Sequence, residues 1–243
     1  MEGLYLQLFI DGLTLGFVYS IVALGYTLVY GILEFINFAN SEIFMFGAFV
    51  GTEAIIYIQG TGMFGNIPVT LALILAIAIS ASLSGGLGFV VDKVAYKPIR
   101  KSPKLVAFIS AIGVSFFLQD AVRMIEGLWK NAFYITVPDV FSKRIDALDK
   151  YFISAKFVFI VVPAVIAMVA VTLFIKRTKW GKSMRAVAQD QTTASLMGIN
   201  TEKTISLTFF MGGALGGFAG TLFAVQYSLI HPYIGFILGI KAF

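Results

Sequence analysis

The chain has no cysteine and a single histidine, His231, and each shortage excludes a class of site. Without thiols it can form neither a disulfide nor a thiolate metal centre, and one imidazole cannot build a clustered-histidine metal site. The sequence has no Gly-x-x-x-x-Gly-Lys-Ser/Thr segment, which is the loop that holds ATP phosphates. No pairing of a nucleophile with a base is visible either. We therefore predict a non-catalytic protein that binds no metal or other cofactor itself.

Charged residues are scarce as well. They make up 13% of the chain, against about 25% in soluble domains, whereas 58% of residues are hydrophobic and the mean hydropathy is +0.89. A soluble chain of this composition would expose large apolar patches, but in a bilayer the same surface faces lipid. A net charge of +5 would suggest nucleic acid in a soluble protein; here the placement of the basic residues explains it better. The composition predicts an all-α integral membrane protein with no nucleic-acid partner.

Long runs without acidic or basic residues predict about six membrane-spanning helices, because a span needs roughly 20 apolar residues. The runs cover 12–33, 43–58 with Glu53 inside it, 67–91, 105–125, 157–175 and 204–240. The fourth run carries Asp120 and Arg123 near one end, at a spacing that favours a structural ion pair.

The last run is too long for one span. Its 37 residues would form a helix of about 55 Å, whereas the hydrocarbon core is about 30 Å thick. His231-Pro232 is the natural break, since proline removes a backbone donor and disfavours helix in the residue before it. We expect one span over 204–230, His231 capping backbone groups at the break, and a partial C-terminal segment from Pro232.

The basic residues predict the orientation. Eleven of the 18 lysines and arginines lie in two loops, 92–104 and 176–203, which the positive-inside rule places in the cytoplasm. Two spans separate these loops, and an even number of crossings returns the chain to the same side of the membrane, so both loops can be cytoplasmic. The loop 126–152 has four basic and four acidic residues and is predicted to lie outside, as are 59–66 and the N-terminus.

Glycines recur every four residues in the last span, at Gly212, Gly216 and Gly220. On a helix this spacing forms a smooth face that lets another helix approach closely. Tight packing inside the chain is one interpretation. A dimer contact or a moving gate along this face is the other.

The segment 34–42 is polar and joins two apolar segments with almost no spacer. It is either a short cytoplasmic turn capped by Asn40 and Ser41, or a broken helix that offers polar groups to a solute. Under the second interpretation the possible solute-pathway residues are the following: Asn37, Asn40, Glu42 and, on the fourth span, Gln119.

The loop 176–203 is too long to be a simple turn. Residues 184–197 have a helix-compatible composition, and Gly198 and Asn200 follow as stop signals. We therefore predict a short amphipathic helix on the cytoplasmic face. In one interpretation this helix rests on lipid headgroups, attracted by its basic flank. In the other, which its small residues favour, it docks into a groove of another protein.

Several long motifs, in the same order, resemble the high-affinity branched-chain amino acid ABC permease family. The segments that carry the resemblance are 12–31, 36–40, 95–100, 110–115, 184–190, 194–200 and 239–243. Two departures stand out. The family has Asn-Phe-Ala-His-Gly-Glu where this chain has Asn37-Phe38-Ala39-Asn40-Ser41-Glu42, and family members continue for about two helices beyond Phe243. The resemblance therefore implies a single permease domain over 1–243 that is C-terminally incomplete.

The resemblance implies a type II-like ABC importer permease of the bacterial or archaeal inner membrane, with Leu, Ile and Val as solutes. Its partners would be a second, similar permease, two cytoplasmic ATPase subunits that hold ATP and Mg²⁺, and an extracytoplasmic solute-binding protein. The loop 176–203 would be the coupling loop that contacts the ATPase. The contact residues expected there are Arg185, Ala186, Ala188, Gln189, Asp190, Ala194, Gly198 and Ile199.

Other functions stay open from the sequence. A related permease could carry urea, short amides or other amino acids, and competition between solutes would separate these. A passive channel or a structural membrane subunit is the alternative of a different class. The long cytoplasmic loop argues against a channel, because a channel needs no ATPase contact.

Overall fold

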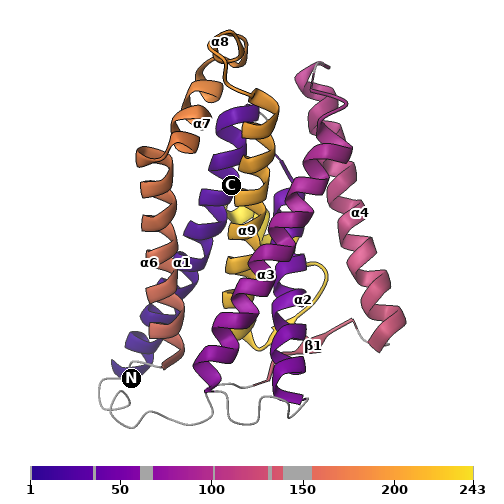
Figure 1. Cartoon of the computed structure of the whole chain (residues 1–243). Coiled ribbons are helices and arrows are strands. Elements are labelled where there is room, and N and C mark those ends of the chain that lie inside the picture. Colours follow the sequence, from indigo (N-terminus) through magenta and orange to yellow (C-terminus); the bar gives the residue numbers. More distant parts are fainter. Residues whose placement is uncertain are drawn as a thin grey trace.

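The chain is almost entirely helical in the computed structural model, which describes residues 2–34, 37–60, 68–100, 102–130, 133–138 and 155–242 (Figure 1). The long helices are α1 (Glu2–Leu33), α2 (Ala39–Gly60), α3 (Val69–Val91), α4 (Lys104–Lys130), α6 (Ala155–Arg177) and α9 (Thr201–Tyr227). The short helices are the π-helix η1 (Asp92–Tyr96), α7 (Lys179–Gln189), α8 (Gln191–Leu196) and α10 (Ile234–Ala242). Six helices of the described chain are long and apolar enough to cross a membrane, which confirms the predicted number.

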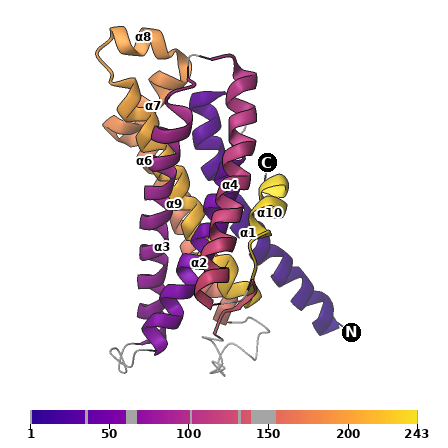
Figure 2. The same ribbon diagram turned by 90° about the vertical axis from the view of Figure 1, so that its right-hand side faces the viewer.

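Helix α9 forms the centre of the bundle, packed among α1, α2 and α3 (Figures 1 and 2). In its most apolar stretch 78% of residues are buried, compared with 11% in α6, which lies at the periphery. The glycines and alanines of α9 explain this difference, because small residues let neighbouring backbones approach on several sides at once.

The two ends of the bundle differ. The helices α7 and α8 and the η1 turn lie at one end, so both basic loops are on the same side, as their parity predicts (Figure 1). Strands β1 (Ile135–Thr136) and β2 (Leu229–Ile230) pair antiparallel at the other end. Much of the two predicted outer loops lies outside the described residues, at 61–67, 131–132 and 139–154.

Helices α1, α2, α4 and α6 extend beyond the apolar runs that predicted them. Helix α1 begins at Glu2 rather than at residue 12 and passes through an exposed Asp11, and α4 continues to Lys130. A charge ends an apolar run but need not end a helix, since charged side chains at a span's end reach the interface. The prediction of an ion pair between Asp120 and Arg123 is wrong, because the two side chains, both of which the structure describes, do not pair. Both side chains are exposed, and the Arg123 guanidinium lies over the Phe133 ring, 5.3 Å from its centroid.

The predicted break at His231-Pro232 is confirmed. Helix α9 ends at Tyr227, the following Ser228 has a left-handed φ of 57°, and the chain resumes as the nine-residue helix α10. His231 caps the break as expected, because its Nδ1 accepts the Tyr233 N–H at 3.2 Å. Helix α10 then packs against α1 and α2 in the middle of the molecule (Figure 2).

Candidate functional site

The polar segment after α1 leads into α2, and its Asn37 side chain is buried whereas Glu34 is exposed. Helix α1 ends at Leu33, Glu34 adopts a left-handed φ of 55°, and α2 begins at Ala39. Asn37 caps α2, since its Oδ1 accepts the Ala39 N–H at 3.1 Å. The expected caps, Asn40 and Ser41, instead lie within the first turn of α2. We call the connection together with this first turn, residues 34–42, the α1–α2 junction.

The three polar residues predicted here lie close together in the sequence, and each is almost fully buried. Asn37 is 2% exposed, Asn40 1% and Glu42 0%. Asn37 Nδ2, Asn40 Nδ2 and Glu42 Oε2 have no hydrogen-bond partner among the described residues. Two unpaired donors and one unpaired acceptor therefore lie buried within one short stretch of chain.

Glu42 lies where three helices meet. Its Oε1 accepts a hydrogen bond from the Ser115 hydroxyl of α4 at 3.2 Å. Its Oε2 faces α10, where a Cβ added to Gly235 would lie 2.7 Å away. Gln119, the fourth predicted residue, is 9% exposed and lies one helical turn after Ser115, so the two share the buried side of α4. The glycines of α10 thus let its backbone approach the carboxylate.

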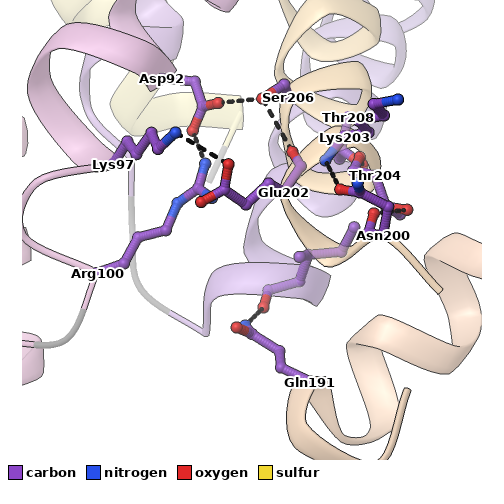
Figure 3. A network of polar contacts seen from close by, with 11 residues as sticks. Asp92, Lys97, Arg100, Gln191, Asn200, Glu202, Lys203, Thr204, Ser206 and Thr208 are labelled. Carbon is purple, nitrogen blue, oxygen red and sulfur yellow. Dashed lines mark hydrogen bonds and ion pairs between the residues drawn. The ribbon is translucent and has the colours of Figure 1, made fainter. Parts of the chain in front are cut away.

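A second polar cluster, which the sequence reasoning missed, lies between the η1 turn and α9 (Figure 3). Asp92 is fully buried; it pairs with Arg100, and its Oδ2 accepts the Ser206 hydroxyl at 2.7 Å. Lys97 and Glu202 form a more exposed ion pair beside it at 2.9 Å. Asp92 was the one acidic residue in a basic loop, and that pattern was the available signal.

The η1 turn also reaches the α1–α2 junction. Its wide turn is closed by a bond from the Lys97 N–H to the Asp92 carbonyl at 2.8 Å. Tyr96, the last residue of the turn, is 1% exposed and donates its hydroxyl to Asn37 Oδ1 at 2.5 Å. Asp92, at the start of this turn, therefore contacts α9, and Tyr96, at its end, contacts Asn37, the cap of α2.

The loop 176–203 contains two helices where one was predicted. Asp190 separates them and caps α8, with its Oδ1 accepting the Thr192 and Thr193 N–H groups at 2.7 and 3.1 Å. Bonds from the Thr193 hydroxyl and from these two N–H groups hold the pKa of the Asp190 carboxyl below its usual value. Helix α8 ends at Leu196, and Gly198 follows it with a left-handed φ of 84°. Asn200 is not a stop signal: it caps α9 by accepting the Lys203 N–H at 2.9 Å.

The residues predicted to contact an ATPase divide between two faces of this loop. Ala194 is buried, and Ala186, Ala188 and Ile199 are half-buried against the chain's own core. The exposed face holds Arg185, Gln189, Asp190 and Gly198, together with two apolar residues that were not singled out, Leu196 and Met197. These last two are 82% and 79% exposed.

Hydrogen bonds from Arg185 and Gln191 join the loop to the ends of two spans. The Arg185 guanidinium donates to the Ile175 carbonyl of α6 at 2.6 Å. The Gln191 amide donates to the Ile32 carbonyl at the end of α1, at 3.1 Å (Figure 3). A cavity of about 300 Å³ lies between the loop, the end of α1 and the segment after η1, and Tyr96 and Arg100 are part of its lining. The loop is thus connected to the helix that leads into the α1–α2 junction.

The predicted glycine face of α9 packs within this chain. A Cβ added to Gly212 would lie 3.0 Å from Val29 of α1, and one added to Gly216 would lie 3.4 Å from the Phe44 nitrogen of α2. One added to Gly220 would lie 2.6 Å from the Ala48 nitrogen. Both α1 and α2 therefore approach the face that these glycines provide.

Comparison with known proteins agrees with this architecture. The model of the branched-chain amino acid transport system / permease component family matches residues 8–243. The chain is 39% identical to the high-affinity branched-chain amino acid transport system permease protein BraD of Pseudomonas aeruginosa, over 98% of this chain and 77% of that protein. It is 38% identical to the Escherichia coli K12 permease protein LivH over the same shares. A probable LivH of Methanocaldococcus jannaschii is 24% identical over 92% of this chain and 67% of that protein. No solved structure matches.

Six apolar spans, a buried polar junction and a match over nearly the whole length lead to one assignment. The chain is a multi-pass protein of the inner membrane, and it belongs to the permease component family of branched-chain amino acid transport systems.

Proposed function

We propose that this chain is the membrane-spanning permease subunit of an ATP-driven ABC importer for branched-chain amino acids, with the α1–α2 junction on the solute pathway. The observation that carries the pathway is a set of three buried atoms there that have no hydrogen-bond partner within the described part of the chain: Asn37 Nδ2, Asn40 Nδ2 and Glu42 Oε2. Unpaired buried polar groups are costly, and in membrane proteins they mark functional sites.

The chemistry of these atoms suits a zwitterionic solute. The free Glu42 oxygen can accept from an ammonium group, and the free amide N–H groups can donate to a carboxylate. Ile43 and Ile234, which are next to Glu42 and Gly235 in the sequence, are buried apolar residues that suit an aliphatic side chain. Because the Glu42 carboxylate is enclosed by α2, α4 and α10, a solute reaches it only when these helices separate.

In this proposal the chain binds no nucleotide or metal, and two partner ATPase subunits hold ATP and Mg²⁺. They contact the exposed face of the loop 176–203, where Leu196 and Met197 offer apolar contact area. ATP binding moves α7 and α8, and the bond from Gln191 to Ile32 passes that movement to the end of α1. A second permease subunit and an extracytoplasmic solute-binding protein complete the importer.

The test is uptake of labelled leucine by cells that lack their own branched-chain amino acid uptake and express this chain with its partner subunits. We expect Glu42→Gln to lower the uptake rate roughly ten- to hundredfold, because hydrogen bonds to charged groups contribute about 1.5–3 kcal/mol. Glu53→Gln is the matched control. It makes the same change on the same helix, at a partly exposed ion pair with Lys130 away from the junction.

Competition identifies the solute. Unlabelled isoleucine and valine should compete with leucine, whereas urea, short amides and other amino acids should not. Competition by urea or amides would assign the related solute class instead. Leucine flux that needs no ATP in liposomes would favour a passive channel. Equal uptake by the Glu42 and Glu53 variants would remove the junction from the pathway.

A further inference from the structure

Tyr96 joins the π-turn η1 to the α1–α2 junction through a buried hydrogen bond. Its hydroxyl donates to Asn37 Oδ1 at 2.5 Å, and its ring packs on Phe209 of α9 with centroids 5.4 Å apart. Asn37 Oδ1 also accepts the Ala39 N–H at 3.1 Å. Two donors from different elements therefore meet on one oxygen of the Asn37 amide.

This arrangement fixes which way the amide points. An asparagine amide has one acceptor end and one donor end. With Oδ1 held by both Tyr96 and Ala39, the Nδ2 end is the one left unpaired within the described structure. A flipped amide would place N–H groups against two donors and lose both bonds.

The rest of the η1 turn provides a rigid support for Tyr96. Asp92 is bonded to Ser206 of α9 and paired with Arg100, so the start of the turn is fixed to the central helix. π-turns are rare and occur frequently at functional sites. Here two buried residues of the turn face inward: Asp92 is bonded to α9, and Tyr96 is bonded to Asn37, the cap of α2.

We propose that Tyr96 is a positioning residue for transport, which acts through Asn37 by orienting its Nδ2 group toward the solute pathway. This inference rests on the proposed function, since it takes the junction to be the pathway. Tyr96 itself does not touch solute. Its hydroxyl determines the orientation of the amide, and its ring determines the distance between the η1 turn and the junction.

The first test is a double-mutant cycle on the leucine uptake rate. Tyr96→Phe keeps the ring and removes only the hydroxyl, and we expect a two- to tenfold lower rate, about the contribution of one hydrogen bond. In an Asn37→Ala background the same change should have no further effect. Tyr30→Phe, at an exposed tyrosine of α1, is the matched control. If Tyr96→Phe lowers the uptake rate by the same factor with and without the Asn37 amide, the proposal is overturned, because Tyr96 then has a purely structural role.

The second test needs no transport. Hydrogen exchange of the Ala39 amide in the nanodisc-embedded complex reports directly on the Asn37 cap. Tyr96→Phe should raise that exchange rate about two- to tenfold while leaving amides in the middle of α9 unchanged. Unchanged exchange at Ala39 would overturn the proposal even if uptake fell. If the native complex takes up no leucine but Tyr96→Phe still speeds exchange at Ala39, the positioning role is supported and the proposed function is contradicted.

Discussion

Single atoms decide how tightly the bundle can close around α9. The Ser80 hydroxyl lies 2.7 Å from the Gly47 carbonyl and 2.9 Å from the Gly217 carbonyl, so α3 meets α2 and α9 at one point. A Cβ added to Gly217 would lie 2.6 Å from the Ser80 carbonyl oxygen, closer than real contacts allow. One added to Gly216, the next residue, would lie 3.4 Å from the Phe44 nitrogen.

These neighbouring glycines make a matched pair. Gly217→Ala should destabilise the folded protein by about 1–3 kcal/mol, since overpacking a filled interior displaces backbone. Gly216→Ala should be tolerated within about 0.5 kcal/mol. Thermal unfolding in detergent, read as loss of monodisperse protein, compares the two. Equal melting temperatures would mean that α3 can move away from α9 at little cost.

The residues of the candidate site were predictable in part. The segment 34–42 stood out because it places polar residues between two apolar segments with almost no spacer, where polar groups near the bilayer interior are costly, and this led to Asn37, Asn40 and Glu42. Their partners were not predictable. Ser115, Gly235 and Tyr96 are ordinary residues in apolar or basic segments, and only the packing of α4, α10 and η1 brings them to the junction.

At the scale of elements, spans were easier to predict than their ends. The break before α10 followed from a length limit and a proline, both of which act locally. The division of the loop 176–203 into α7 and α8 depends on Asp190, whose side chain accepts bonds from the next turn. An aspartate inside a helix-compatible stretch carries no unambiguous sign that it will act as a cap rather than as an exposed surface residue.

Asp190 gives this division a pH dependence. Its pKa is lower in the folded state than in the unfolded chain, so it stabilises α8 fully above its unfolded pKa of about 3.9. That stabilisation is lost as the pH falls toward the folded-state pKa. Hydrogen exchange of the α8 amides, compared at equal pH, should therefore be slower in the native chain than in Asp190→Ala at pH 7. The difference should shrink below about pH 4.

The amides of α7 are the internal reference, because Thr178 caps that helix independently by accepting the Gly181 N–H at 3.0 Å. A difference between native chain and variant that does not change with pH would show that the Asp190 charge contributes nothing to the cap.

At the scale of the whole molecule, the two basic loops lie at the same end of the helix bundle. The basic loops 92–104 and 176–203 share the end that carries α7 and α8, and the β1–β2 pair lies at the other (Figure 1). Neither packing nor hydrogen bonding determines which end faces the cytoplasm, because both would be unchanged if the protein were inverted. The asymmetry of lysine and arginine is the physical cause that selects one orientation during insertion.

Because the native chain has no cysteine, a single introduced thiol can report this orientation. Lys182→Cys lies on α7, and Tyr134→Cys replaces a 65% exposed side chain beside β1. In intact spheroplasts a membrane-impermeant maleimide should label Tyr134→Cys and leave Lys182→Cys unlabelled. In inside-out vesicles the pattern should reverse. The opposite result would place α8, with Leu196 and Met197, outside the cell, where no cytoplasmic ATPase could contact it, and the proposed route from ATP to the α1–α2 junction would then be wrong.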